Sequence, residues 1–347
     1  MILTIQIIGA VLIFGILVFV HELGHFLAAK KFGVMVHEFA IGMGPIIWKK
    51  QSSKDETLYS IRCIPLGGFC KMEGEDEESD DARSFTKITW WKKIIVLAAG
   101  GVFNLIMGLL LCIVMGFASG AIPVAKVAKS TNPQLLQGDI ILSIDNKKVY
   151  YSKDIEEYMM SVLKSEKTRE FNVTINRNGK VTQKNIKASY NEDYGRYMLG
   201  YEADYENVGF LSGLQYGFYD FWWWTKLTIS NLVGLITGKI SANLLSGPVG
   251  IFGTLGGVVG EVAKGTSYAW EMLSSLFLQL TLGLGILNLI PFPALDGGRI
   301  VFVLVQAVSR KKISAEKEGW IHLIGLTLLI GLVLFATYND ILRLIAK

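Results

Sequence analysis

The chain has 347 residues, 51% of them apolar, and its mean hydropathy is +0.40. Such a composition excludes an ordinary soluble protein and predicts a polytopic membrane protein. The net charge is only +4, with no basic stripe suited to a phosphate backbone, so we expect no nucleic-acid partner.

Four stretches are long and apolar enough to cross about 30 Å of hydrocarbon. They cover roughly residues 4–29, 94–118, 274–307 and 320–342, and the third is interrupted. The first has no basic leader and no small-residue cleavage site, so it is expected to be a membrane helix and not a cleaved signal peptide. The predicted fold class is a polytopic α-helical membrane protein with about four transmembrane helices.

The first span ends in the segment His21-Glu22-Leu23-Gly24-His25. Positions i and i+4 of a helix share one face, so His21 and His25 can bind one Zn²⁺ while Glu22 acts on water as general base. We expect Gly24 to keep the helix slim for an approaching substrate. The pattern predicts metal-assisted hydrolysis, and the alternative is a pair of helix-end histidines without a metal.

A β-hairpin or small sheet is expected between Val36 and Gly68, within the first predicted domain, residues 1–120. Residues 57–64 alternate loosely and end in Pro65-Leu66-Gly67-Gly68. The segment Gly42-Met43-Gly44-Pro45 predicts a tight loop dipping toward the membrane, or a plain turn. The acidic run 73–81 predicts a solvated loop.

The three cysteines are an odd number and indicate neither a disulfide nor a metal framework. Cys63 and Cys70 are expected to be small buried hydrophobes, and Cys112 lies within the second span.

Residues 121–190 predict a soluble insert between spans two and three. A strand is expected at 140–145, a helix at 153–165, and a hairpin of 171–177 with 180–188 around Asn178-Gly179. This order resembles a PDZ domain, whose most recognisable segment is matched by residues 138–145. Such domains commonly bind an extended peptide at a sheet edge.

Residues 191–260 are predicted to hold an interfacial amphipathic helix, at 208–240, and a Gly-rich connector, at 246–260. Phe221-Trp222-Trp223-Trp224 heads the helix, and tryptophans favour the membrane interface. The alternative is a fifth crossing, which would put the following site on the wrong side of the bilayer. The connector is expected to be flexible or re-entrant.

Residues 261–347 carry the last two spans. The segment from Asn288 to Gly298 contains two prolines and two glycines, which break a helix in apolar surroundings. A lone carboxylate there, Asp296, costs about 2.5–3.5 kcal/mol on insertion scales, and a metal ion would offset that cost. A two-histidine zinc site needs one more protein ligand, which Asp296 supplies, although a helix N-cap is the alternative.

Basic residues near the membrane set the expected orientation. They cluster after span one, before span two and after span three, which predicts cytoplasmic ends there: Lys30, Lys31, Lys87, Lys92, Lys93, Arg310, Lys311 and Lys312. Both termini and the insert are then extracytoplasmic, and the two metal-binding segments share the cytoplasmic half of the bilayer.

The segment from His21 to His25, the segment Leu295-Asp296-Gly297 after Asn288, and a single PDZ-like insert together resemble the site-2 protease family of intramembrane zinc metalloproteases. The bacterial RseP/RasP type is the most similar, and Pro65-Leu66-Gly67-Gly68-Phe69 resembles the membrane-proximal β-element of the family. The resemblance implies that Glu22 is the catalytic carboxylate, that His21, His25 and Asp296 hold zinc, and that Asn288 positions substrate or the oxyanion.

The resemblance has two departures, of which one is the single PDZ-like insert where some relatives carry two. Gly100-Gly101 stands where many relatives have Gly-Pro before an asparagine, so Asn104 is either a substrate-binding residue or a helix-packing amide. His37 and His322 match no motif and are expected at the surface or at an interface.

The expected function is an intramembrane zinc endopeptidase of the bacterial inner membrane that cuts single-span membrane proteins. Anti-sigma factors already trimmed outside, or remnant signal peptides, are the substrates that the resemblance implies, with the insert gating or recruiting them. A locally unwound substrate would pair with a sheet edge near Tyr59 to Ile64, and the candidate binding residues are Tyr59, Ile61, Gly67 and Gly68.

The alternative function is a membrane metal transporter or metal sensor, because intramembrane His and Asp also mark ion pathways. Such a protein needs polar residues along several spans, and these spans hold little beyond Asn104. The sequence does not predict the oligomeric state.

Overall fold

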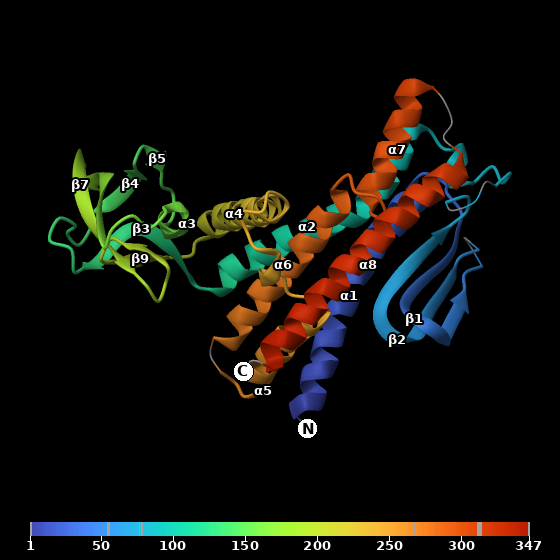
Figure 1. Ribbon diagram of the computed structural model, residues 1–347, viewed down its shortest axis with the longest axis horizontal. Helices are drawn as coiled ribbons and strands as arrows, with labels where there is room; N and C mark the ends of the chain where they lie inside the picture. Colours follow the sequence, from blue (N-terminus) through green and yellow to red (C-terminus); the bar gives the residue numbers. More distant parts are fainter. Residues whose placement is uncertain are drawn as a thin grey trace. The chain divides into compact units, whose positions relative to one another are not determined.

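The computed structural model describes residues 2–53, 56–75, 77, 79–266, 268–310 and 314–345. Four residues used in the predictions lie outside this description: Lys311 and Lys312 of the orientation pattern, and Asp76 and Glu78 of the acidic run. The chain divides into two compact units, residues 1–112 with 218–347, and residues 113–217 (Figure 1).

Seven helices of eight residues or more contribute to the described part of the first unit. They are α1 (Ile2–Lys31), α2 (Trp90–Ala118), α4 (Phe210–Ile236), α5 (Pro248–Ala263), α6 (Ala269–Leu289), α7 (Asp296–Ser309) and α8 (Ala315–Ile345). Two short 3₁₀ turns lie at Phe85–Lys87 and Ala242–Leu244.

Four helices of the described chain are long and apolar enough to cross a membrane: Thr4–Lys31, Trp90–Ala118, Ala269–Leu289 and Glu316–Ile345. This confirms the prediction of about four membrane helices. The interrupted third span is two helices, α6 and α7, separated by residues 290–295.

The two strands β1 (Val36–Gln51) and β2 (Leu58–Met72) form the sheet beside α1 (Figure 1). Both are long and folded back on themselves, so residues 58–61 pair with 38–41 on one side and with 48–51 on the other. Residues 68–72 pair on one side only, with 36–41. Segment 68–72 is therefore one free edge of this sheet, and segment 48–51, which pairs with 58–61 alone, is the other.

Two predictions for glycine-containing segments are wrong, one of them only in part. Gly42 and Gly44 lie inside β1, where their φ angles of +85° and +81° bend the strand instead of forming a loop. The segment 246–260 belongs largely to helix α5, which contradicts the flexible form of the expected connector, while its re-entrant alternative stays a prediction. Glycine is a poor helix former in water, but it lets helices pack closely: a Cβ at Gly9 of α1 would sit 2.7 Å from Val259 of α5.

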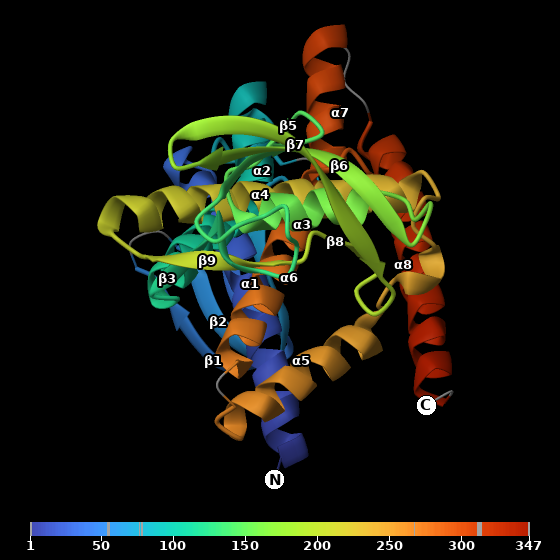
Figure 2. The ribbon, with the colours of Figure 1, turned by 90° about the vertical axis from the view of Figure 1, so that its left-hand side faces the viewer.

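The second unit is built on a seven-stranded sheet in the order β8-β7-β6-β4-β3-β9, with β5 beside β4 (Figure 2). Its elements are β3 (Ala121–Ser130), β4 (Ile140–Ile144), β5 (Lys147–Lys148), α3 (Ser152–Ser161), β6 (Thr168–Arg177), β7 (Lys180–Asn191), β8 (Arg196–Met198) and β9 (Tyr201–Asn207). The expected hairpin turn is present, with φ of +53° at Asn178 and +85° at Gly179.

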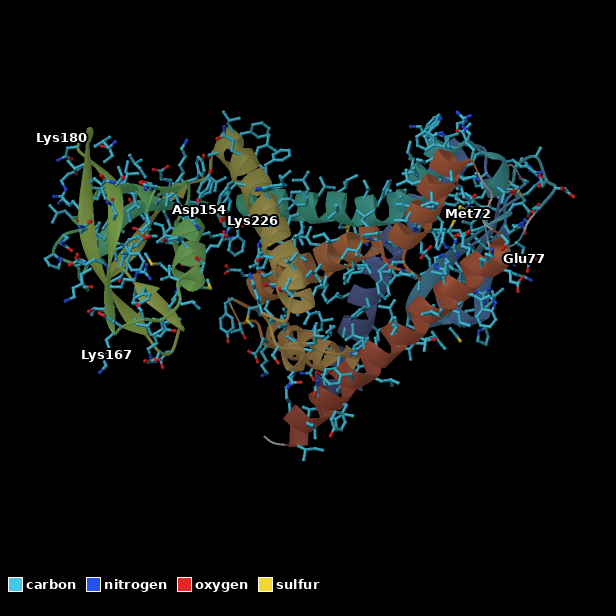
Figure 3. All side chains as sticks on the ribbon, turned by 45° about the horizontal axis from the view of Figure 1, so that its top comes forward. Met72, Glu77, Asp154, Lys167, Lys180 and Lys226 are labelled. Carbon is cyan, nitrogen blue, oxygen red and sulfur yellow. The ribbon has the colours of Figure 1, made fainter. Side chains whose placement is uncertain are left out.

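Figure 3 shows Lys180 and Lys167 at opposite ends of the β6–β7 hairpin, and Asp154 on α3. The sheet and α3 enclose an apolar core that includes Ile141, Ile155 and Phe171. Because β8 and β9 continue the sheet as far as Asn207, the unit extends beyond the predicted boundary at residue 190.

Asp139 anchors this unit. Its side chain is 1% exposed, accepts hydrogen bonds of 2.7 Å from both Nε and Nη2 of Arg177, and accepts another from the Leu136 backbone N–H at 2.9 Å. The Arg177 hydrogen bonds hold the pKa of Asp139 below its ordinary value.

We predict that Asp139→Asn destabilises the sheet by about 2 kcal/mol at pH 7, because charge-assisted hydrogen bonds are lost. Because the pKa of Asp139 is lower in the folded than in the unfolded protein, its ionised form stabilises the fold at pH values above the ordinary pKa of 3.8. The difference in stability between wild type and variant should therefore vanish as the pH falls through the folded-state pKa. The free energy of unfolding is measured by urea titration followed through the hydrogen exchange of residues 168–191, corrected for intrinsic exchange rates. The exposed Asp193→Asn is the control, and a pH-independent difference would contradict the assignment.

Candidate active site

Three side chains from α1 and the start of α7 converge on one point. The Nε2 atoms of His21 and His25 are 3.2 Å apart, and Asp296 Oδ2 lies 3.2 Å from the first and 3.4 Å from the second. Among the described residues, this is the one group of three His, Cys, Asp or Glu side chains arranged to hold a metal ion.

The triangle of ligand atoms fits zinc. A tetrahedral Zn²⁺ with bonds of about 2.0–2.1 Å to N and O places its ligand atoms about 3.3–3.4 Å apart. The edges of 3.2, 3.2 and 3.4 Å agree with that spacing. Two nitrogens and one carboxylate oxygen are also the donor set of a catalytic zinc site, which keeps its fourth position open.

Helix α2 orients both imidazoles. His25 Nδ1 lies 2.9 Å from the Val96 carbonyl oxygen and can donate a proton to it, which leaves Nε2 as the metal-binding nitrogen. His21 Nδ1 lies 3.3 Å from Nδ2 of Asn104, whose side chain is fully buried and whose Oδ1 has no hydrogen-bond partner. Turning this amide over places Oδ1 where it accepts from His21 Nδ1–H, the tautomer that leaves Nε2 for a metal. Thr281 of α6 donates to the Asn104 backbone carbonyl at 3.4 Å. The structure therefore places Asn104 behind His21, where its fully buried amide can orient the ring, as a helix-packing amide would.

Two glycines allow α1 and α2 to approach this closely. A Cβ on Gly24 would overlap the Ala99 carbonyl, and a Cβ on Gly100 would overlap His25 Nε2 and crowd the His21 ring. The expectation for Gly24 is therefore wrong, because this residue faces α2 and not a substrate. Gly100 lies next to Gly101, the position where many relatives have proline, and its missing side chain leaves room for the two imidazoles.

Glu22 lies beside the cluster and faces the sheet. Its carboxylate accepts a hydrogen bond from the Cys70 backbone N–H. A Cβ at Gly68 would be 3.6 Å from Glu22 Cγ and 3.8 Å from Val18. The free edge at residues 68–72 therefore runs past the carboxylate that was predicted to be the general base.

Asp296 is the first residue of α7, directly after the break at 290–295. Arg299, one turn later, donates to Glu75 at 2.5 Å and links α7 to the loop after β2. Leu295 occupies the N-cap position and Asp296 the first helical one, so the N-cap alternative for Asp296 is wrong.

The other predicted substrate residues fall into two groups. Gly67 and Gly68 lie at the bend that begins this free edge, with φ of +86° at Gly67. Tyr59 and Ile61 lie where β2 is paired on both sides, and the Tyr59 ring packs against Phe26 and Phe39. The predicted sheet edge at 59–64 is thus closed over 59–61. Asn288 is half-buried in the last turn of α6.

Several supporting residues escaped sequence reasoning. Val96 acts through its backbone carbonyl, which carries no signal in the sequence. His322 of α8 accepts a hydrogen bond from the Ala294 backbone N–H at 2.9 Å, although it matches no motif.

His37 is exposed and paired with Glu73, as expected for a surface histidine. Cys70 and Cys112 are buried, whereas Cys63 is exposed, contrary to expectation.

We predict that Gly100→Ala abolishes zinc binding without unfolding the protein, since Ala is the better helix former and its Cβ would overlap Nε2 of His25 and displace the two imidazoles. Gly108→Ala in the same helix is the matched control. Its Cβ would meet the flexible end of Leu282 at 2.6 Å, away from the ligands, so zinc should be retained. Metal analysis of both purified variants decides, and stoichiometric zinc in Gly100→Ala would refute the geometry.

Comparison with known proteins agrees with this site. Residues 9–332 match the model of peptidase family M50. A Fusobacterium nucleatum protein, provisionally named a zinc metalloprotease, is 36% identical over 96% of this chain and 98% of its own length. The regulator of sigma-W protease RasP of Bacillus subtilis is 30% identical over 97% of this chain and 98% of its own.

One solved structure, the PDZ domain of an SdrC-like protein from Listeria monocytogenes, is 23% identical in sequence. The match covers 24% of this chain and 87% of that one. Its TM-score of 0.19 is too low to classify the insert. The full-length matches are decisive, and they set aside the metal transporter and metal sensor. The chain belongs to peptidase family M50, the site-2 proteases, and is a membrane-embedded zinc metalloprotease.

Proposed function

We propose that the chain is an intramembrane endopeptidase in which His21, His25 and Asp296 hold the zinc and Glu22 is the catalytic base. The observation that carries this proposal is the triangle of ligand atoms at zinc spacing, with two of its corners on a helix able to cross a membrane. Buried polar groups at membrane depth are expensive, so such a triangle indicates function.

Zinc at these ligands would supply a Lewis acid that polarises the scissile carbonyl and acidifies a water. The Glu22 carboxylate takes a proton from the attacking water and delivers it to the leaving amine. The Cys70 N–H holds that carboxylate in place. Asn104 and the Val96 carbonyl keep the two imidazoles oriented throughout.

The substrate must present an unwound segment, because a helix hides its carbonyls in hydrogen bonds. Residues 68–72 pair with a strand on one side only and run next to Glu22, so we assign β-addition of the substrate to this edge instead of to Tyr59 and Ile61. Gly67 and Gly68 carry no side chains that would obstruct it. Asn288 is retained as a candidate substrate contact.

The basic residues at the end of α1 and at the start of α2 support a cytoplasmic placement of the site. Both termini and the insert would then be extracytoplasmic, in the plasma membrane of a bacterium. Single-span membrane proteins such as trimmed anti-sigma factors, or remnant signal peptides, are the proposed substrates. The name of the Bacillus subtilis relative supports the former.

We predict that Glu22→Gln keeps zinc and fold but lowers cleavage of a transmembrane model substrate by about 10²–10⁴-fold, the usual contribution of a general base. Glu271→Gln, which neutralises an exposed carboxylate on α6, should cleave normally. The rates are compared in one detergent or vesicle preparation. Cleavage by Glu22→Gln at a rate close to wild type would exclude the base role.

We also propose that the insert, which we interpret as PDZ-like, screens substrates by size. The deletion must remove residues 121–207, because β8 and β9 belong to the same sheet and would otherwise be left unpaired. A gate predicts that the deletion permits cleavage of a substrate with an intact ectodomain and leaves cleavage of the trimmed form unchanged. Slower cleavage of the trimmed form, with the intact form still uncut, would instead show recruitment.

A further inference from the structure

The turn that precedes Asp296 contains a residue in an unfavourable backbone conformation. Leu295 N–H donates to the Phe292 carbonyl at 3.1 Å, so Pro293 and Ala294 are the central residues of the turn. Ala294 has a φ of +77°. A type II turn needs positive φ at this position and favours glycine, because a Cβ there is crowded. With alanine in this place, a contact from outside the turn is needed to stabilise it.

His322 of α8 supplies that contact. The Ala294 backbone N–H donates to His322 Nδ1 at 2.9 Å, which requires an unprotonated Nδ1. The ring is held on the other side by Phe302 of α7, with ring centroids 5.5 Å apart, and its Nε2 faces Glu318 Oε1 at 3.8 Å. The His322 ring, which projects from α8, is thus held by contacts with α7, with the turn at Ala294 and with its own helix.

Close backbone packing makes the turn sensitive to α8. Gly325 lies three residues after His322, on the same helix face, and a Cβ there would overlap the Pro293 carbonyl. On the opposite side, a Cβ at Gly297 or Gly298 of α7 would overlap the carbonyls of Ile290 or Phe292. The turn is therefore enclosed between α8 and the first turn of α7, the turn that Asp296 begins.

We propose that His322 is a positioning residue of the zinc site. Its hydrogen bond keeps Ala294 in the left-handed conformation and thereby sets the direction in which the chain enters α7, which fixes Asp296 Oδ2 at the third corner of the triangle. The inference rests on the proposed ligand role of Asp296. Partners that orient a ligand typically affect metal affinity by about 10–100-fold.

The first test compares His322→Ala with His322→Asn. The asparagine Oδ1 can accept from Ala294 in place of the imidazole Nδ1, whereas alanine cannot. We expect about tenfold weaker zinc binding for His322→Ala in a chelator titration, a lower kcat with little change in KM, and near wild-type values for His322→Asn. Leu323→Ala, an exposed neighbour on α8, controls for truncation within the same helix turn.

The second test uses backbone coupling. Glycine adopts positive φ without crowding, so Ala294→Gly should make the turn independent of His322. In the Ala294→Gly protein, His322→Ala should therefore change zinc affinity by no more than about twofold. If the two substitutions acted independently, His322→Ala would weaken zinc binding by the same factor as it does in wild type. A merely structural role of His322 in α8 would not be relieved by a glycine at position 294.

Hydrogen exchange of residues 290–299 in zinc-free protein reads the turn directly, and we expect faster exchange in His322→Ala than in His322→Asn. Wild-type exchange and zinc affinity in His322→Ala, or no relief by Ala294→Gly, would overturn the inference. Asp296→Ala is measured alongside. Zinc persisting in that variant would refute the ligand assignment, while wild-type exchange in His322→Ala refutes the role of His322 alone.

Discussion

The rest of the first unit depends on placing three electron-pair donors within about 3.3 Å of one another in apolar surroundings, at the spacing of a zinc coordination shell. His21 and His25 are 8% and 7% exposed, so water does little to offset the mutual repulsion of these atoms and Asp296. A divalent cation stabilises the arrangement. The two imidazoles must also keep fixed tautomers. The Val96 carbonyl provides this for His25, and the buried Asn104 amide provides it for His21 when its oxygen faces Nδ1.

Close helix contacts follow from that constraint. Helix α2 can orient the imidazoles only because Gly24 and Gly100 let the two backbones approach. Farther along α2, Gly101 meets Gly285 of α6, with each Cβ position within 2.9 Å of the other's carbonyl oxygen. Small residues are the usual means of packing helices in lipid, where no hydrophobic effect drives them together. These glycines therefore bring the proposed zinc ligands together as well as packing helices.

Sequence patterns predicted what is local. The i, i+4 spacing of His21 and His25, the four apolar stretches and the Asn178-Gly179 hairpin each follow from short-range geometry. Tertiary context decided the rest: α5 is a helix because its glycines pack on α1, and the edge at 59–61 is closed because β1 and β2 fold back on themselves. His322 was missed because its partner is a backbone N–H 28 residues away, which no side-chain motif records.

The most direct test of this account is X-ray absorption at the zinc edge, combined with metal analysis, on the purified wild-type protein. The account predicts one Zn²⁺ per chain surrounded by two imidazoles and further oxygen ligands at about 2.0–2.2 Å. Asp296→Ala should lose the metal, and His37→Ala, which alters an exposed histidine, should retain it. A sulfur ligand at about 2.3 Å, or stoichiometric zinc in Asp296→Ala, would contradict the assigned site.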